Sequence, residues 1–252
     1  DAPLTQPITP HSRPQINQYL TNEGAGFNAY FLTDTKEISS ETTEAYMAIR
    51  GSDGEFKLSD PSNWNDWFGN DASFALFDAH VPQAELATDG IKHTLDKLDE
   101  KGSKAKLDLT AHSLGTFVTV QGVAGLDPKD WDKVDEMVLF NGPDPTDSLK
   151  KMGLTNEQIK ALGDKTTYYL NPFDMVSMLN RTAPYEEQFG NVKIMVPMTY
   201  TTSMVKDGSA HLFGQYQIGA DGEILTASKD YHPELLEAGQ KLAALNEKYL
   251  GL

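Results

Sequence analysis

The chain has 252 residues, of which 39% are hydrophobic, and this suffices for one α/β domain with a core of its own. A formal net charge of −16 argues against nucleic acid as a partner and against docking on anionic lipid by charge, so transient contact with a membrane surface has to be local and apolar. The absence of cysteine excludes disulfides, a thiolate nucleophile and cysteine-bound metal.

The N-terminal stretch is rich in proline. Residues 1–14 contain four prolines and few apolar residues, a composition typical of an extended segment on a surface. We expect residues 1–26 to form an arm packed on the domain and residues 27–252 to form a single domain. The chain begins at Asp1 and holds no apolar run long enough to cross a bilayer. We therefore expect a processed protein that is secreted or at the cell surface.

Alternating apolar and polar residues predict the first strands. Residues 27–32 form one strand, residues 44–50 its antiparallel partner, and residues 72–77 a further strand. A helix that ends near Gly102 follows, because apolar residues recur at spacings of three and four. These residues are Ala84, Ala87, Ile91, Leu95 and Leu98.

Strands and helices alternate in the rest of the chain. The expected strands are residues 105–110, 136–140, 166–170 and 192–196. The expected helical segments are residues 114–124, short helices within 149–162, and a final helix that begins at Pro233. This order predicts an α/β fold with a mostly parallel central sheet flanked by helices.

One serine lies where an apolar strand gives way to a helix. Residues 107–117 read Leu-Asp-Leu-Thr-Ala-His-Ser-Leu-Gly-Thr-Phe, so Ser113 stands between the small residues Ala111 and Gly115. This pattern is typical of the nucleophile elbow of α/β-hydrolases, with alanine in place of the first glycine. Small residues are needed because the strand and helix backbones nearly touch there. We therefore predict an α/β-hydrolase fold with Ser113 as its nucleophile.

The serine needs a base, and in this fold the chain order is Ser, then Asp or Glu, then His. Of six histidines, two follow Ser113 at a distance: His211 and His232. His211 lies in an irregular, glycine-containing stretch, where loops present catalytic groups. His232 directly precedes Pro233 at the start of a helix, which favours a structural capping role. We predict His211 as the base and keep His232 as the alternative.

Asp174 is the predicted acid. It follows an apolar strand that ends at Asn171, which places it at the carboxyl end of the sheet, where sites in α/β folds lie. A solvated turn aspartate is the alternative interpretation of this residue. Three competitors are less suitable, because two resemble turn residues that cap a helix and the third precedes its strand: Asp144, Asp147 and Asp164.

With these residues placed, the chain resembles the class 3 lipases, the fungal-type triacylglycerol lipases and their bacterial relatives. Residues 45–54, Ala-Tyr-Met-Ala-Ile-Arg-Gly-Ser-Asp-Gly, look like the family's strand that ends in Phe-Arg-Gly-Ser. Residues 63–71, Asn-Trp-Asn-Asp-Trp-Phe-Gly-Asn-Asp, are similar to its Asn-Trp-x-x-Asp segment. The resemblance implies that the backbone N–H of Ser52, with that of Leu114, forms the oxyanion hole.

The resemblance continues toward the C-terminus. Residues 171–176, Asn-Pro-Phe-Asp-Met-Val, look like the family's acid loop, and His211 with Tyr216 resembles its His-x-x-x-x-Tyr ending. Departures include Ile49 in place of phenylalanine, Ala111 in place of glycine, and a wider spacing from Ser52 to the Trp segment. These departures fit a divergent bacterial branch of the family.

The resemblance implies a serine hydrolase that cleaves carboxylic esters of lipids, as a lipase or a phospholipase A, through an acyl-enzyme. The alternatives are an esterase for small or carbohydrate-linked esters, and a non-catalytic relative that uses the pocket for binding. The chemistry requires no cofactor and no metal. Three acidic residues lack the spacing of a calcium loop and are expected to be solvated: Asp60, Asp66 and Asp71.

Apolar residues near the expected site bear on the substrate. We expect Trp64, Phe68 and Met204 to line an acyl groove or a movable cover, and Trp67 and Met195 to belong to the core. A groove of this kind implies a long-chain ester. The acidic surface then favours neutral or zwitterionic lipid.

Overall fold

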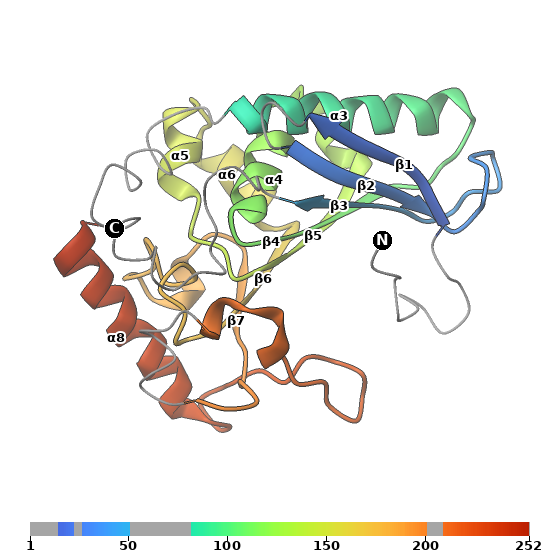
Figure 1. Cartoon of the computed structure of the whole chain (residues 1–252). Helices are drawn as coiled ribbons and strands as arrows, with labels where there is room; N and C mark the ends of the chain where they lie inside the picture. Colours follow the sequence, from blue (N-terminus) through green and yellow to red (C-terminus); the bar gives the residue numbers. More distant parts are fainter. Residues whose placement is uncertain (1–14, 23–26, 51–81, 201–208, 252) are drawn as a thin grey trace.

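A computed structural model describes residues 15–22, 27–50, 82–200 and 209–251 of the chain (Figure 1). The strand expected over residues 72–77 lies outside the described residues. Within the described ranges, no helix combines the length and the apolar character needed to cross a membrane.

Strands in the described part of the chain form one seven-stranded sheet, in which spatial order follows chain order. The antiparallel part consists of β1 (Gln15–Asn22), β2 (Phe27–Thr33) and β3 (Ala45–Arg50). From β3 onward all pairs are parallel, through β4 (Leu107–His112), β5 (Val134–Phe140), β6 (Thr166–Leu170) and β7 (Asn191–Ile194). The predicted antiparallel pair is confirmed, whereas β1 is an additional strand that the sequence pattern did not indicate.

Helices lie between the parallel strands in the chain, and one more helix follows the last strand. They are α3 (Pro82–Glu100), α4 (Leu114–Ala124), α5 (Thr146–Lys151), α6 (Asn156–Gly163) and α8 (Pro233–Leu250). The bounds of α4 match the prediction, while β4 begins two residues later and β5 two residues earlier than expected. In Figure 1, α3 lies at the top and α8 at the lower left, at opposite ends of the sheet.

The helix α4 forms the middle of the core. Every residue from Gly115 to Ala124 is buried, and a helix that is apolar on all sides is a core helix. It crosses α3 closely, since a Cβ built on Gly122 would lie 2.8 Å from the Cβ of Ala87. The Thr88 hydroxyl donates a hydrogen bond to the Gly122 carbonyl across this crossing, at 2.8 Å. The position of α4, and of the turn before it, is therefore fixed by close packing.

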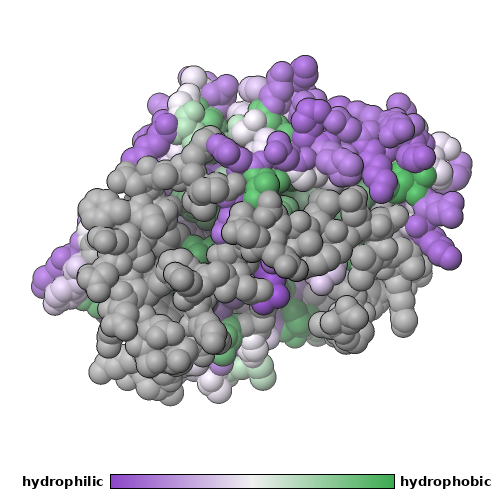
Figure 2. Space-filling view, turned by 45° about the horizontal axis from the view of Figure 1, so that its top comes forward, coloured by the Kyte–Doolittle hydropathy of each residue, from purple (hydrophilic) through white to green (hydrophobic). Residues whose placement is uncertain are grey.

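A mostly parallel sheet with helices on its flanks, and a sharp strand-to-helix turn from β4 into α4, is the α/β-hydrolase fold. The predicted fold class is confirmed. Much of the described surface seen in Figure 2 is hydrophilic, which agrees with the net charge of −16.

Asp108 occupies a half-buried position on β4. Burial is the main cause that raises its pKa to about 6, and repulsion from Glu136 and Asp135 adds to it. Because the pKa in the folded state lies above its ordinary value of 3.8, ionisation of Asp108 opposes folding. The stability of the protein is therefore lowered as pH rises from about 4 to about 6, and the penalty is complete above that range.

We expect Asp108→Asn to stabilise the protein at pH 7 by about 1 kcal/mol, after allowance for solvent screening of a half-exposed group. Near pH 4 the variant and the wild type unfold together, because Asp108 is then largely protonated. Thermal unfolding followed by circular dichroism at both pH values checks this. Asp164→Asn is the control, since Asp164 is exposed and pairs with Lys160. Equal midpoints for Asp108→Asn and wild type at pH 7 contradict the expectation.

Candidate active site

Ser113 occupies the turn between β4 and α4. Its backbone adopts φ 59° and ψ −130°, a strained conformation that L residues rarely take. Its N–H donates a hydrogen bond to the Phe140 carbonyl at the end of the neighbouring strand β5, at 3.0 Å. The buried small residues Ala111 and Gly115 flank the turn. The serine thus stands at the carboxyl end of the parallel sheet, as the sequence pattern indicates.

His211 lies beside Ser113. It ends a short 3₁₀ turn, Ser209–His211, and its side chain is buried. Its Nε2 is 2.7 Å from the Ser113 hydroxyl. The other ring nitrogen, Nδ1, is 2.7 Å from Oδ2 of Asp174. The three predicted residues are therefore joined in one hydrogen-bonded chain.

The Asp174 carboxylate is buried, and it accepts hydrogen bonds from several donors. Oδ1 accepts from the backbone N–H of Val176 at 3.1 Å, and Oδ2 accepts from that of Ser177 at 3.2 Å. The Ser177 hydroxyl also donates to Oδ2, at 2.5 Å. These donors and the His211 ring therefore engage both carboxylate oxygens. Asp174 is thus not a solvated turn residue.

The partners of His211 define its tautomer. An ionised Asp174 accepts the Nδ1–H proton, so in neutral His211 the Nε2 lone pair faces the Ser113 hydroxyl. Such an imidazole can take the hydroxyl proton when the oxygen attacks an electrophile. The geometry suits acyl transfer.

His112 precedes the serine and contacts the base. Burial, with a smaller contribution from the neighbouring His211, lowers the pKa of His112 to about 4, so His112 is neutral at pH 7. Its Nε2–H donates to the His211 carbonyl at 2.8 Å, and the two rings lie 4.9 Å apart. His112 therefore adds no positive charge beside the base.

Sequence reasoning did not find Arg181, which supports the acid loop. Its guanidinium is fully buried and donates to the carbonyls of Ser177 at 2.7 Å and Gly142 at 2.8 Å. Burial lowers the pKa of Arg181, and Asp144, at 3.9 Å, offsets this. The only signal in the sequence is an arginine that closes the apolar stretch after Asp174.

The alternative acids and base have other partners. Asp144 accepts from the N–H of Thr146 at the start of α5, although the N-cap position of that helix is Pro145, and it is buried beside Arg181. Asp147 lies in the first turn of α5, and Asp164 pairs with Lys160. His232 precedes α8 as predicted but makes no capping hydrogen bond, and its Nδ1 is 2.8 Å from Glu234.

Several predicted residues fall outside the described ranges: Ser52, Trp64, Trp67, Phe68, Met204, Asp60, Asp66 and Asp71. Leu114 is described as the first residue of α4, a position whose N–H has no acceptor within the helix. Across the described ranges, no group of three or more His, Asp or Glu side chains is placed to hold a metal ion.

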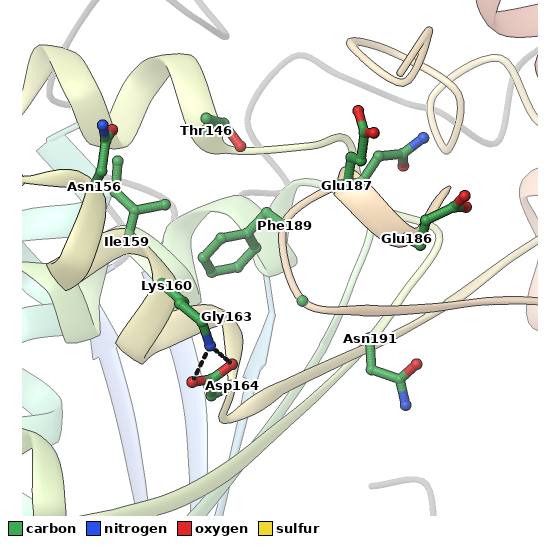
Figure 3. Close-up of a pocket in the computed structure, with 12 residues that line it drawn as sticks. Thr146, Asn156, Ile159, Lys160, Gly163, Asp164, Glu186, Glu187, Phe189 and Asn191 are labelled. Atoms are coloured by element: carbon green, nitrogen blue, oxygen red, sulfur yellow. Dashed lines mark hydrogen bonds and ion pairs between the residues drawn. The ribbon is translucent and has the colours of Figure 1, made fainter. Parts of the chain in front are cut away.

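A pocket of about 520 Å³ lies between α6 and the start of β7 (Figure 3). Phe189 and Ile159 supply its apolar lining, and Glu186 and Glu187 lie across from α6. Neither Ser113 nor its two partners line this pocket, so it is separate from the hydrogen-bonded chain.

No protein-family model matches the chain, and no curated protein matches it. Among solved structures, a fungal lipase matches with 13% identity and a TM-score of 0.47, over 86% of this chain and 72% of that one. The lipase of Rhizopus microsporus var. chinensis matches with 13% identity and a TM-score of 0.45, over 88% and 70%. Lipase II of Rhizopus niveus matches with 15% identity and a TM-score of 0.42, over 75% and 68%. All three are described as lipases of fungi.

His232→Ala separates the two candidate bases. We expect this variant to keep full esterase activity and to lose about 1 kcal/mol of stability or less, because its partner Glu234 is a surface residue at a helix end. Hydrolysis of a soluble nitrophenyl ester and thermal unfolding measure the two effects. An inactive His232→Ala beside an active His211→Ala reverses the assignment of the base.

Proposed function

We propose that this protein is a serine hydrolase that cleaves carboxylic esters of lipids through an acyl-enzyme. The observation that carries the proposal is the buried chain from Ser113 through His211 to Asp174, at a strained strand-to-helix turn. A buried chain of this kind costs backbone strain and desolvation, so its occurrence at the carboxyl end of the sheet favours catalysis over a structural role.

In the proposed mechanism, the Ser113 oxygen attacks the ester carbonyl while His211 Nε2 takes its proton. The C–O bond to the alcohol then breaks, and His211 returns the proton to the leaving alcohol. Water repeats the sequence on the acyl-enzyme, releases the carboxylic acid and restores the serine. Asp174 holds the imidazole tautomer and stabilises its positive charge. The N–H groups of Leu114 and Ser52 bind the oxyanion, at about 3 kcal/mol for each donor.

Apolar residues beside the site support a lipid substrate. Phe173 precedes the acid and stacks on Tyr200 at 5.6 Å. Leu212 follows the base in the chain and is 52% exposed. Apolar side chains next to the acid and the base in the chain suit an acyl chain or a lipid surface. With the acidic overall charge, they favour a neutral or zwitterionic lipid.

An esterase for small or carbohydrate-linked esters is the second candidate function. The same three residues perform that chemistry, so the preference for chain length, not the mechanism, separates the two. A phospholipase differs from a lipase only in the lipid that it accepts, and hydrolysis of phosphatidylcholine beside a triglyceride distinguishes these.

We expect Ser113→Ala and His211→Ala each to lower ester turnover by several orders of magnitude, about 10⁴-fold or more, because the two residues act as a unit. A fluorophosphonate probe labels the wild-type protein at Ser113 and leaves Ser113→Ala unlabelled. Turnover of a nitrophenyl ester and peptide mass spectrometry measure both effects.

Ser228→Ala is the matched control, since Ser228 is exposed and lies in a surface turn. It retains full turnover and full labelling. Near-normal turnover in Ser113→Ala rejects the hydrolase proposal, and a label on Ser177 shows that the nucleophile was misassigned.

The substrate proposal predicts a selective loss. Replacing both Trp64 and Phe68 by serine weakens hydrolysis of long-chain lipid esters much more than that of an acetate or butyrate. Only the long chain gains from burial of apolar area, at about 25 cal/mol per Å². Nitrophenyl esters of graded chain length measure the ratio. Equal losses on long and short esters indicate structural damage, and no loss on either favours the small-ester esterase.

A further inference from the structure

Asn141 is the residue that directly follows β5, and its hydrogen bonds reach the segments that carry the base and the acid. Its side chain is fully buried. Its backbone has φ 51°, in the left-handed region, which asparagine tolerates better than most residues. Its N–H donates to the Tyr169 carbonyl at 2.9 Å, so the backbone itself is held by the neighbouring strand β6.

The Asn141 amide contacts the segment that carries the base. Its Nδ2–H donates to the His211 carbonyl at 3.2 Å. That carbonyl also accepts from His112, whose Nε2–H is therefore a donor and cannot accept from Asn141. His211 is in this way fixed through its own backbone from two directions.

The amide oxygen of Asn141 contacts the segment that carries the acid. Oδ1 accepts from the Asn171 N–H at 3.1 Å, and from the Tyr216 hydroxyl at 2.9 Å. The His211 carbonyl needs a donor and the Asn171 N–H needs an acceptor. Only one orientation of the Asn141 amide, with Nδ2 toward His211 and Oδ1 toward Asn171, satisfies both. The Ser177 hydroxyl lies 3.3 Å from Oδ1, but its single proton is engaged by Asp174 at 2.5 Å.

We propose that Asn141 is a positioning residue that sets the distance between the base segment and the acid loop, and so aligns His211 with Asp174 and Ser113. This inference rests on the proposed function. Neither segment is bonded to the other by regular secondary structure near the site, since His211 lies in a 3₁₀ turn and Asp174 in a turn after β6. One planar amide that bonds to both therefore fixes their relative position, and errors of about 1 Å in such positions cost about 10²-fold in rate.

Asn141→Gly removes the amide while keeping the backbone, because glycine adopts φ 51° without strain. We expect kcat on a soluble ester to fall about 10- to 100-fold, with KM within about twofold, since Asn141 does not contact substrate. The low-field proton NMR signal of the His211 Nδ1–H is lost or shifted. The matched control is Asn180→Gly, because Asn180 also has a left-handed backbone, at φ 58°. It keeps kcat and the NMR signal.

A wild-type kcat and an unchanged Nδ1–H signal in folded Asn141→Gly overturn the positioning role. A fall in kcat of equal size in Asn180→Gly overturns it as well, because the effect then follows from the backbone. If Asn141→Gly does not fold, kcat and the His211 Nδ1–H signal are measured in Asn141→Asp instead. This variant keeps the acceptor and loses the donor to His211, so a wild-type kcat with an unchanged signal again overturns the positioning role. Ester turnover that persists in Ser113→Ala rejects the proposed function, whereas the NMR signal tests the positioning role without any turnover.

Discussion

The backbone of Ser113 is the constraint on which the rest of the site depends. A single residue with φ 59° and ψ −130° joins β4 to α4, and the buried small residues Ala111 and Gly115 flank it. The Thr116 hydroxyl donates to the Ser113 carbonyl at 2.6 Å. On its other side, Thr116 lies so near Gly142 that a Cβ there would be 1.9 Å from the hydroxyl oxygen. The segment that follows β5 therefore packs closely against the first turn of α4.

Such strain has to be compensated by the surrounding structure. The helix α4 is buried from Gly115 to Ala124 and packs on α3, β3 and β4, so its burial stabilises the turn that begins it. The acid Asp174 reaches the turn from the segment that follows β6, and the base His211 from the segment that follows β7. Both are near Ser113 because parallel strands bring their carboxyl ends to one edge of the sheet. Hydrogen bonds from Asn141, His112 and Arg181 then fix these segments.

The sequence predicts those parts of the molecule that depend on local patterns. Small residues around Ser113, and an apolar run on each side of it, determine the turn and the bounds of α4. The order of Ser113, Asp174 and His211 follows from the fold once the turn is recognised. The start of β4 differs from the prediction because Leu107, not Ala105, is the first residue that pairs with β3, and strand ends are set by pairing.

Tertiary hydrogen bonds leave no such local pattern. Asn141 looks like a turn residue in Asn-Gly-Pro-Asp, and nothing near it in the chain reveals that its amide bonds to residues 30 and 70 positions away. Arg181 is unremarkable in sequence for the same reason, although it is fully buried. The edge strand β1 depends on pairing with β2 and was not indicated by the proline-rich composition before it.

The central claim is that the Ser113 oxygen becomes acylated during turnover. An acid quench after brief mixing of the protein with a slowly hydrolysed nitrophenyl ester, followed by peptide mass spectrometry, tests this most directly. We expect a burst of nitrophenol close to one equivalent and an acyl group on the peptide that contains Ser113. Steady hydrolysis without a burst or an adduct on that peptide, or an adduct on a different residue, contradicts it.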